Sequence, residues 1–400
     1  MDSPLLASDL WSSLVLPEEY LGKHLKLLGN PDKAVNSSFK IADAAQTTVG
    51  LSALAAAYLH YLRTGVEQDV TVDARHAILE FQSHAFYTID GKPPGPPSDP
   101  IMGIYRTKGD GYVRLHTNFP HHRKGLLDIL KIEDTPAVTR DQVQEALLQW
   151  TALDFENAAQ EKGICAFAMR SFQEWDSTPQ AKALLNTPPL YIRKIADVPV
   201  PERMTSDFKH PLEGIKVLDL SRVLAGPVGG RILAAHGADV LLVTSPNLPP
   251  LPALDADTSR GKRTTQLDLT SKDGLEKLRE LAGEADVFLQ AYRPGALENK
   301  GFGVQDIVQL TKNRGRGVIC ANLCAWGWEG PWKDRRGFDS LVQTASGLNI
   351  AEAEAYAKYT GTEDIPLSPT VVLKNLAPRL SRVRKIKKFK KIQKNACKLF

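Results

Sequence analysis

The chain is poor in cysteine, in long apolar runs and in metal-ligand patterns. Its four cysteines, Cys165, Cys320, Cys324 and Cys397, are scattered except for one C-x3-C pair that has no nearby histidine. A disulfide framework and a zinc site are therefore not indicated, and reduced thiols in an intracellular compartment are expected. No apolar run approaches the ~18 residues of a membrane span, and the acid at position 2 argues against a secretory signal.

Acidic side chains are absent from the last 22 residues. Residues 379–400 hold 10 of the 50 Lys and Arg residues, which leaves 40 basic against 46 acidic residues elsewhere. The formal net charge of +4 therefore misrepresents the body of the protein, for which we expect no nucleic-acid partner. Apolar residues recur every third position among the tail lysines from Val383 to Ile392, which would suit an anionic membrane surface. A divergent terminus without a role is the favoured interpretation of this tail.

A composition of 42% hydrophobic and 24% charged residues over 400 positions is ordinary for a globular protein of two or three domains. Residues 215–220 predict a buried strand that leads through Ala225, Gly226 and Pro227 into a helix, and strands alternate with helices as far as residue 323. This alternation predicts a doubly wound parallel sheet, whose ligands bind at the carboxyl ends of the strands. Free N–H groups at the helix start would suit a phosphate. Since GxGxxG is absent, an ordinary strand-to-helix turn is an equally good interpretation.

The first half of the chain has a different pattern. A helix is predicted from Ala44 to about Leu62, with Asp43 at its entrance, where the helix dipole stabilises a carboxylate. On the residues alone, Asp43 is a helix cap. A hairpin within GIYRTKGDGYVRL and amphipathic helices over residues 139–186 follow, and prolines between 188 and 201 mark a linker. The histidines at positions 116, 121 and 122 lack accompanying carboxylates or cysteines, so a polar helix start is favoured over a metal site.

Six segments between residues 212 and 348 resemble, in order, the motifs of the family III CoA-transferases, also called the CaiB/BaiF family. They are LDLSRVLAGP, HGADVLLV, SRGKRTTQLDL, ADVFLQAYRPG, WGWEGP and GFDSLVQTASG. The segment IADAAQTTVGLSALAAAYLHYLRTG is similar to the family's nucleophile helix, and residues 100–195 resemble its smaller domain. In the family, these two segments normally come after the six motifs. The resemblance therefore implies that the segments stand in swapped order here, as in a tandem or permuted arrangement.

The resemblance implies an α/β fold, with a doubly wound, Rossmann-like CoA-transferase domain plus a smaller α+β domain. No second aspartate-bearing segment follows Gly347, so the family's C-terminal segment is expected to be missing. We expect an N-terminal lead at 1–36, a nucleophile-helix segment at 37–99, a small α+β domain at 100–200, a Rossmann-like CoA-binding domain at 201–350 and a divergent basic tail at 351–400.

The resemblance places Asp43 on the family's nucleophile and Gly50 on the glycine seven residues later. In the family, the aspartate attacks an acyl-CoA to give a mixed anhydride, the CoA thiolate returns to form an aspartyl-CoA thioester, and an acceptor carboxylate takes the CoA. Aspartate, with a reference pKa of ~3.9, is ionised at neutral pH and needs no general base for this attack. Gly327 and Gly330 match the glycine loop that would approach the reacting carbonyl, although turn geometry alone would also explain them.

The same resemblance implies a CoA site along the opening turn. Basic residues at such points suit phosphates, whereas isolated surface charges are more often simply solvated. Ser245 and Ala291 stand where the family commonly has an Arg and an Asn. The expected CoA contacts are Arg222, Val223, Leu224, Ala225, Lys262, Arg263, Tyr292 and Arg293.

Three functions follow from these observations. The first is a homodimeric CoA-transferase acting on an acyl-CoA and a carboxylic acid, with no tightly bound cofactor. The second is a non-catalytic acyl-CoA-binding paralogue, which the swapped order and Ser245 would support. The third, an α-methylacyl-CoA racemase, is disfavoured because Phe338 stands where that branch has a proton-transferring histidine. The cytoplasm is the expected compartment, with the mitochondrion and peroxisome left open.

Overall fold

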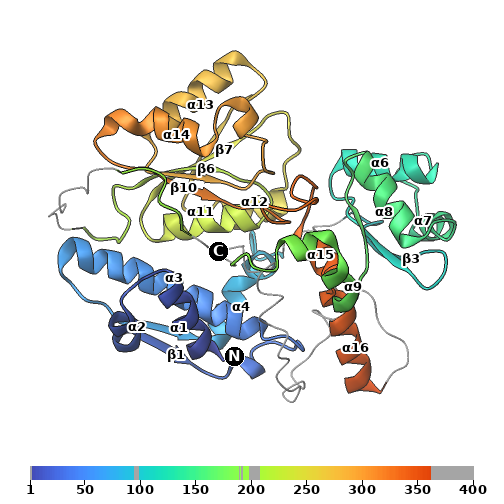
Figure 1. Ribbon diagram of the computed structural model, residues 1–400, viewed down its shortest axis with the longest axis horizontal. Coiled ribbons are helices and arrows are strands. Elements are labelled where there is room, and N and C mark those ends of the chain that lie inside the picture. Colours follow the sequence, from blue (N-terminus) through green and yellow to red (C-terminus); the bar gives the residue numbers. More distant parts are fainter. Residues whose placement is uncertain (1, 94–98, 189, 191, 198–207, 362–400) are drawn as a thin grey trace.

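The structure is a computed structural model that describes residues 2–93, 99–188, 190, 192–197 and 208–361. These residues form an N-terminal group of helices with a two-stranded sheet, a small domain with a three-stranded sheet, and a domain built on a five-stranded sheet (Figure 1). Within this part of the chain, no helix has the length and apolar character needed to cross a bilayer.

The five-stranded sheet is parallel throughout and has the order β10-β9-β6-β7-β8. The predicted doubly wound α/β fold is thereby confirmed. The chain runs from β6 through β7 to β8 on one side of the first strand, and then returns to β9 and β10 on the other. The topological switch point therefore lies between the neighbouring strands β6 and β9. The strands are β6 Lys216–Leu220, β7 Asp239–Thr244, β8 Arg263–Gln266, β9 Val287–Gln290 and β10 Ile319–Asn322.

Helices cover both faces of this sheet. The helices α13 Lys272–Glu284 and α14 Val304–Thr311 lie on one face, and α11 Ala225–Ala235 and α12 Pro252–Thr258 lie on the other (Figure 1). Side chains of β6 alternate between the faces: Leu218 and Leu220 pack with Leu278 and Phe288, whereas Val217 packs in a separate cluster on the α11 side. The short 3-10 helices η2 Glu298–Lys300 and η3 Lys312–Arg314 flank α14.

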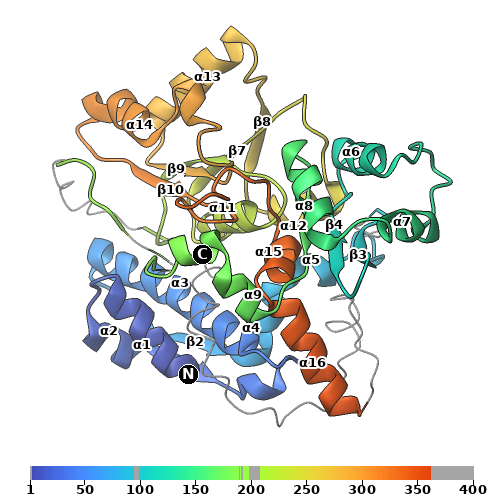
Figure 2. The same cartoon turned by 45° about the vertical axis from the view of Figure 1, so that its right-hand side comes forward.

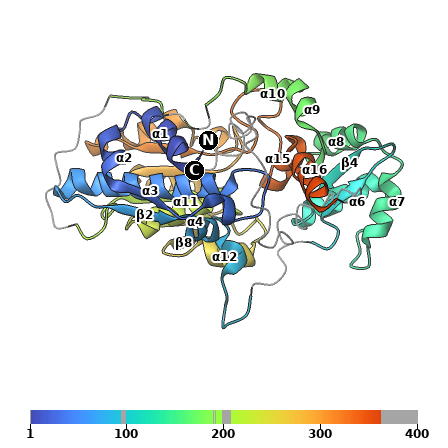
Figure 3. The ribbon, with the colours of Figure 1, turned by 90° about the horizontal axis from the view of Figure 1, so that it is seen from below.

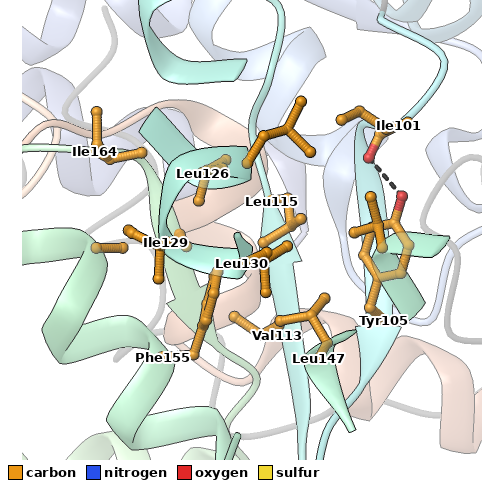
Figure 4. Packing of buried hydrophobic residues seen from close by; sticks show 14 of the residues in the cluster. Ile101, Tyr105, Val113, Leu115, Leu126, Ile129, Leu130, Leu147, Phe155 and Ile164 are labelled. Carbon is orange, nitrogen blue, oxygen red and sulfur yellow. Dashed lines mark hydrogen bonds between the residues drawn. The ribbon is translucent and has the colours of Figure 1, made fainter. Parts of the chain in front are cut away.

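The small domain is built on an antiparallel sheet of order β3-β4-β5. Its core lies between this sheet and three helices, where Val113 and Leu115 of β4 are completely buried against Leu126 and Phe155 (Figure 4). The other face of the sheet packs Phe167 against Trp326 and further tryptophans. The elements are β3 Gly103–Arg106, β4 Tyr112–Leu115, α6 Pro120–Leu130, α7 Arg140–Leu147, α8 Ala152–Glu161, β5 Ala166–Ala168, α9 Phe172–Ser177 and α10 Pro179–Ala183.

The N-terminal group is organised around α3 Ile41–Thr64. A Cβ atom at Gly50 of α3 would lie 3.2 Å from Leu27 and 3.3 Å from Leu25, so the helix packs closely on strand β1. Strand β1 pairs in parallel with β2, which joins the predicted lead to the predicted nucleophile-helix segment in one small sheet. The other elements are α1 Ser3–Ser13, α2 Glu18–His24, β1 Leu25–Leu28, η1 Pro31–Lys33, β2 Val70–Asp73, α4 Ala74–Phe81 and α5 Ser83–Phe86.

Two further helices, α15 Asp339–Ala345 and α16 Leu348–Thr360, follow the parallel sheet. Figure 2 shows α15 beside the small domain and α16 extending beyond it. Residues 351–360 of the expected divergent tail are therefore part of a helix. Residues 362–400 of that tail, with its basic amphipathic pattern and Cys397, lie outside the described residues.

Candidate functional site

Asp43 lies in the first turn of α3, and its side chain is only 4% exposed. The Ser3 hydroxyl at the start of α1 donates to Asp43 Oδ1 at 3.1 Å, and Lys40 Nζ lies 3.7 Å from Oδ2. The N-cap position of α3 belongs to Lys40, and no side chain caps the helix there. The interpretation of Asp43 as a helix cap is therefore wrong, although its carboxylate still faces the positive end of the helix dipole.

Lys40 keeps a positive charge beside this carboxylate. Its partial burial acts to lower its pKa, but the hydrogen bond with Asp32 and the charge of Asp43 outweigh that effect and raise the pKa above its ordinary value. Lys40 is consequently protonated throughout the neutral range. Asp43 thus combines the features that a carboxylate nucleophile needs: little exposure to water, one fixed oxygen and a permanent cation close by.

A second group of candidate residues follows the carboxyl end of β6. Val223 has a φ of 74°, in the left-handed region that is costly for a β-branched side chain. Helix α11 begins two residues later at Ala225, so its first turn stands at the switch point beside the residues that follow β9. Arg222 reaches across this region, where its guanidinium donates to the carbonyl of Pro249 at 2.7 Å and lies 5.4 Å from the ring centroid of Phe119.

Two glycines allow α11 to approach the sheet closely. A Cβ atom at Gly226 would lie 2.5 Å from the Cβ of Ser221 and 2.6 Å from that of Ala291, and one at Gly230 would lie 2.1 Å from Asp219 Oδ2. Contacts this short do not occur between real Cβ atoms, so both positions require glycine, and position 291 requires a small side chain. This role of the two glycines was not predicted from the sequence, although their four-residue spacing on one helix face indicates it.

The position of Lys262 argues against its expected contact with CoA. Its side chain is completely buried beneath α11, where Nζ lies 2.8 Å from the equally buried Asp219 Oδ2 and donates to the Pro227 carbonyl at 2.7 Å. Ser221 also donates to Asp219. The ammonium group thus holds the start of α11 against β6.

Arg263 is also placed away from the expected site. It is the first residue of β8, and its guanidinium holds both carboxylate oxygens of Asp239, the first residue of β7, with the shortest contact at 2.7 Å. Both residues therefore lie at the amino ends of their strands. Because ligands of doubly wound sheets bind at the carboxyl ends, this position argues against the expected contact of Arg263 with CoA.

Tyr292 and Arg293 do lie at the carboxyl edge, directly after β9. The backbone N–H of Tyr292 donates to Gln290 Oε1 at 2.8 Å, and its ring packs against the core on the α13 side, where burial raises its pKa. The exposed Arg293 side chain donates to the carbonyl of Asp334 at 3.2 Å. The edge therefore gathers Arg222, Val223, Leu224 and Ala225 after β6 with Tyr292 and Arg293 after β9.

The glycine loop follows β10 and is held by one buried amide. Gln180 of α10 is fully buried; its Nε2 donates to the carbonyls of Trp326 and Glu329 at 2.7 and 2.9 Å, and its Oε1 accepts from the N–H of Trp332 at 2.7 Å. Gly327 and Gly330 have φ values of 93° and 87°. A Cβ atom at position 330 would lie 2.5 Å from Gln180 Oε1. Turn geometry and close packing thus explain Gly330, and the positive φ alone explains Gly327.

Asp43 comes from the N-terminal group rather than from the sheet edge. The segment before it contacts α16 and α9, because Ser38 N–H donates to Glu352 at 2.9 Å and the Phe39 and Phe172 rings lie 6.3 Å apart. Farther along, α5 packs against α12 and α4 reaches α11 through Glu80; Figure 3 shows α4 beside α11 and α12. Buried Arg231 of α11 makes this second junction by pairing with Asp257 at 2.6 Å and by reaching Ser83 and Glu80.

Comparison with known proteins gives two matched stretches and several relatives. CoA-transferase family III matches residues 21–187 and 212–365. The stretches follow one another along the chain and show no swap, and nothing in them indicates a missing C-terminal segment. Among the relatives, an acyl-CoA transferase of Gibberella moniliformis is 29% identical over 78% of this chain and 60% of its own length.

In two further relatives, the match again covers only part of the relative's own length. The acetyl-coenzyme A transferase nodX of Hypoxylon pulicicidum is 26% identical over 89% of this chain and 66% of its own length. The succinyl-CoA:glutarate CoA-transferase of Homo sapiens is 32% identical over 44% of this chain and 41% of its own length. The chain thus spans less than two thirds of each relative. Because the two family matches together cover most of its sequence, the chain belongs to CoA-transferase family III.

Proposed function

We propose that the chain moves CoA from an acyl-CoA donor to a carboxylic acid acceptor through a covalent intermediate on Asp43. The observation that carries this proposal is the environment of that carboxylate, which is almost fully buried yet has a hydroxyl on one oxygen and a cation beside the other. A carboxylate so placed is poorly hydrated and oriented, both of which favour nucleophilic attack.

The chemistry would proceed by successive acyl exchanges at Asp43. A carboxylate oxygen of Asp43 attacks the thioester carbonyl, which forms a mixed anhydride and releases the CoA thiolate. The thiolate then attacks the aspartyl carbonyl of the anhydride, which forms an aspartyl-CoA thioester and releases the donor acid. The acceptor carboxylate repeats these steps in reverse, so CoA leaves on the acceptor and Asp43 is regenerated. No step removes a proton from the nucleophile, and Ser3 and Lys40 orient its oxygens.

We place CoA along the switch point of the parallel sheet. Arg222, Val223, Leu224 and Ala225 would contact it from the β6 side, and Tyr292 and Arg293 from the β9 side. Gly327 and Gly330 would present backbone groups to the reacting carbonyl. The relatives' names refer to acetyl and succinyl groups, which supports a short acyl donor. We also infer that a second copy of the chain takes part.

Mass spectrometry of the intact protein after incubation with short acyl-CoAs and hydroxylamine tests the proposal. A hydroxamate mapped to Asp43 is expected in the native protein and absent in Asp43→Asn. Asp32→Asn is the matched control, because it alters the other carboxylate partner of Lys40 and leaves the nucleophile intact. CoA binding without an adduct from any acyl-CoA would contradict the transferase proposal and favour a binding protein.

A further inference from the structure

Three arginines at the edge of the parallel sheet lack carboxylate partners. Arg222, Arg293 and Arg336 make their hydrogen bonds to backbone carbonyls or imidazoles. Among the described residues, no Asp or Glu lies within ion-pair distance of any of the three. Several other arginines of the described residues are paired with acids, as in the contacts of Arg123 with Asp99 and of Arg231 with Asp257, although Arg63 and Arg114 are not.

Arg336 is held in place by neutral groups. Its Nη1 donates to His121 Nε2 and His122 Nε2, each at 2.9 Å, and its backbone carbonyl accepts from the Trp326 indole at 3.1 Å. Burial, followed by neighbouring positive charge, lowers the pKa of both histidines, that of His122 to about 3. Both rings are therefore neutral near pH 7. They fix the guanidinium without neutralising its charge.

The three guanidinium groups are linked through shared neighbours. Arg222 lies 5.4 Å from the centroid of the Phe119 ring, which is 5.9 Å from the ring of His121, a partner of Arg336. Arg293 donates to the carbonyl of Asp334, two residues before Arg336. Burial and then the charge of Arg336 lower the pKa of Arg293, so these two cations repel each other. Asp334 faces Arg293, and Asp255 faces Arg222, but only as more distant charges. Positive charge thus accumulates where the sheet edge meets α6 of the small domain, a costly arrangement unless an anion binds there.

We propose that Arg336 completes a three-arginine anion site with Arg222 and Arg293, in which His121 and His122 position its guanidinium for an anionic group of the substrate. The inference rests on the proposed function for the identity of that substrate. Guanidinium groups bind phosphate and carboxylate through the same paired donors. The anion is therefore either a phosphate of CoA or a second carboxylate on a dicarboxylic acyl or acceptor group.

The experiment compares Arg336→Gln with the native protein and with Arg263→Gln. The glutamine amide can still donate to His121 or His122 but carries no charge. Arg263 is an exposed arginine of the same domain at the opposite end of the strands, so it controls for loss of one charge. Calorimetry measures the affinities for CoA, 3′-dephospho-CoA and succinate, and thermal unfolding verifies that each variant is folded.

Two results support the site, and each identifies one source of the anion. A roughly tenfold weaker affinity of Arg336→Gln for CoA, with a smaller salt dependence, identifies a phosphate; if 3′-dephospho-CoA is unaffected, it is the 3′-phosphate. A similar loss for succinate, with CoA unchanged, identifies a carboxylate. Native-like affinity for all three ligands in Arg336→Gln overturns the site. Because these affinities do not depend on Asp43, a missing covalent adduct would end the transferase proposal and leave the anion site standing.

Discussion

The burial of Lys262 gives it a structural role that could not be predicted from the sequence alone. Its pairing with Asp219 occurs with both side chains completely shielded from water, and removing one member of such a pair leaves an uncompensated charge that costs about 3–5 kcal/mol. We therefore expect Lys262→Met to lower the free energy of unfolding by about that amount, as measured by urea denaturation. The double variant Asp219→Asn with Lys262→Met should recover part of the loss. Equal losses in the single and double variants would contradict the pairing.

His116 makes stability depend on pH. Its ring stacks on Phe338 with centroids 3.9 Å apart, and burial, together with Arg114, lowers its pKa to about 4. Since the unfolded chain has a histidine pKa of ~6.5, the unfolded state binds more protons between these values. The stabilisation is therefore complete above about pH 6.5 and declines as the pH falls toward 4.

The variant His116→Phe keeps an aromatic stack and removes the titration. We expect the native protein to lose on the order of 3 kcal/mol more than this variant between pH 7 and pH 4. Unfolding measured at several pH values checks the difference, with the exposed His76→Phe as a control that should follow the native curve. Parallel curves for the native protein and His116→Phe would show that burial of His116 is not coupled to its protonation.

At the scale of elements, the close packing of α11 on the parallel sheet requires glycine at the position that faces the sheet. A Cβ atom at Gly230 would lie 2.1 Å from Asp219 Oδ2, whereas one at Gly229 would meet only Leu289 Cδ2 at 3.8 Å. We expect Gly230→Ala to destabilise the protein by at least about 1–3 kcal/mol through overpacking. Gly229→Ala should be neutral or stabilising by up to about 1 kcal/mol, since alanine is the better helix former. Denaturant unfolding of the two variants provides the comparison, and equal effects would contradict this packing.

The elements themselves were largely predictable, because their signals are local. The strand at residues 215–220, the turn at Ala225 and the alternation that follows all reflect short-range hydrophobic periodicity. Roles that depend on strand register could not be predicted from the sequence. Lys262 and Arg263 are adjacent in the chain, yet one points beneath α11 and the other pairs with Asp239 at the amino edge. Arg336 was missed for a related reason, since its partners lie more than two hundred positions away.

At the scale of the whole molecule, Arg231 connects the group that carries Asp43 to the domain that carries the proposed CoA site. Glu80 and Ser83 come from the N-terminal group, and Asp257 comes from α12. If Asp43 is the nucleophile, loosening this junction should slow formation of its adduct more than it weakens CoA binding. We expect Glu80→Gln to lower the adduct rate several-fold at nearly unchanged CoA affinity.

Time-resolved mass spectrometry and calorimetry measure these two quantities. Glu280→Gln is a suitable control, because Glu280 forms an exposed ion pair with Lys277 of the same helix, α13. A parallel loss of adduct rate and CoA affinity would indicate general destabilisation rather than altered placement of Asp43.

The side chain of Gln180 couples the position of α10 to that of the glycine loop. Its three hydrogen bonds join α10, which follows the small sheet, to the loop at residues 326–332, which follows the parallel sheet. Separating α10 from the loop would break these three hydrogen bonds and leave buried polar groups unpaired, which costs free energy. We therefore expect the loop and α10 to keep their relative positions. A movement of α10 would therefore move Gly327 and Gly330 with it, so the helix and the loop would move as one rigid unit.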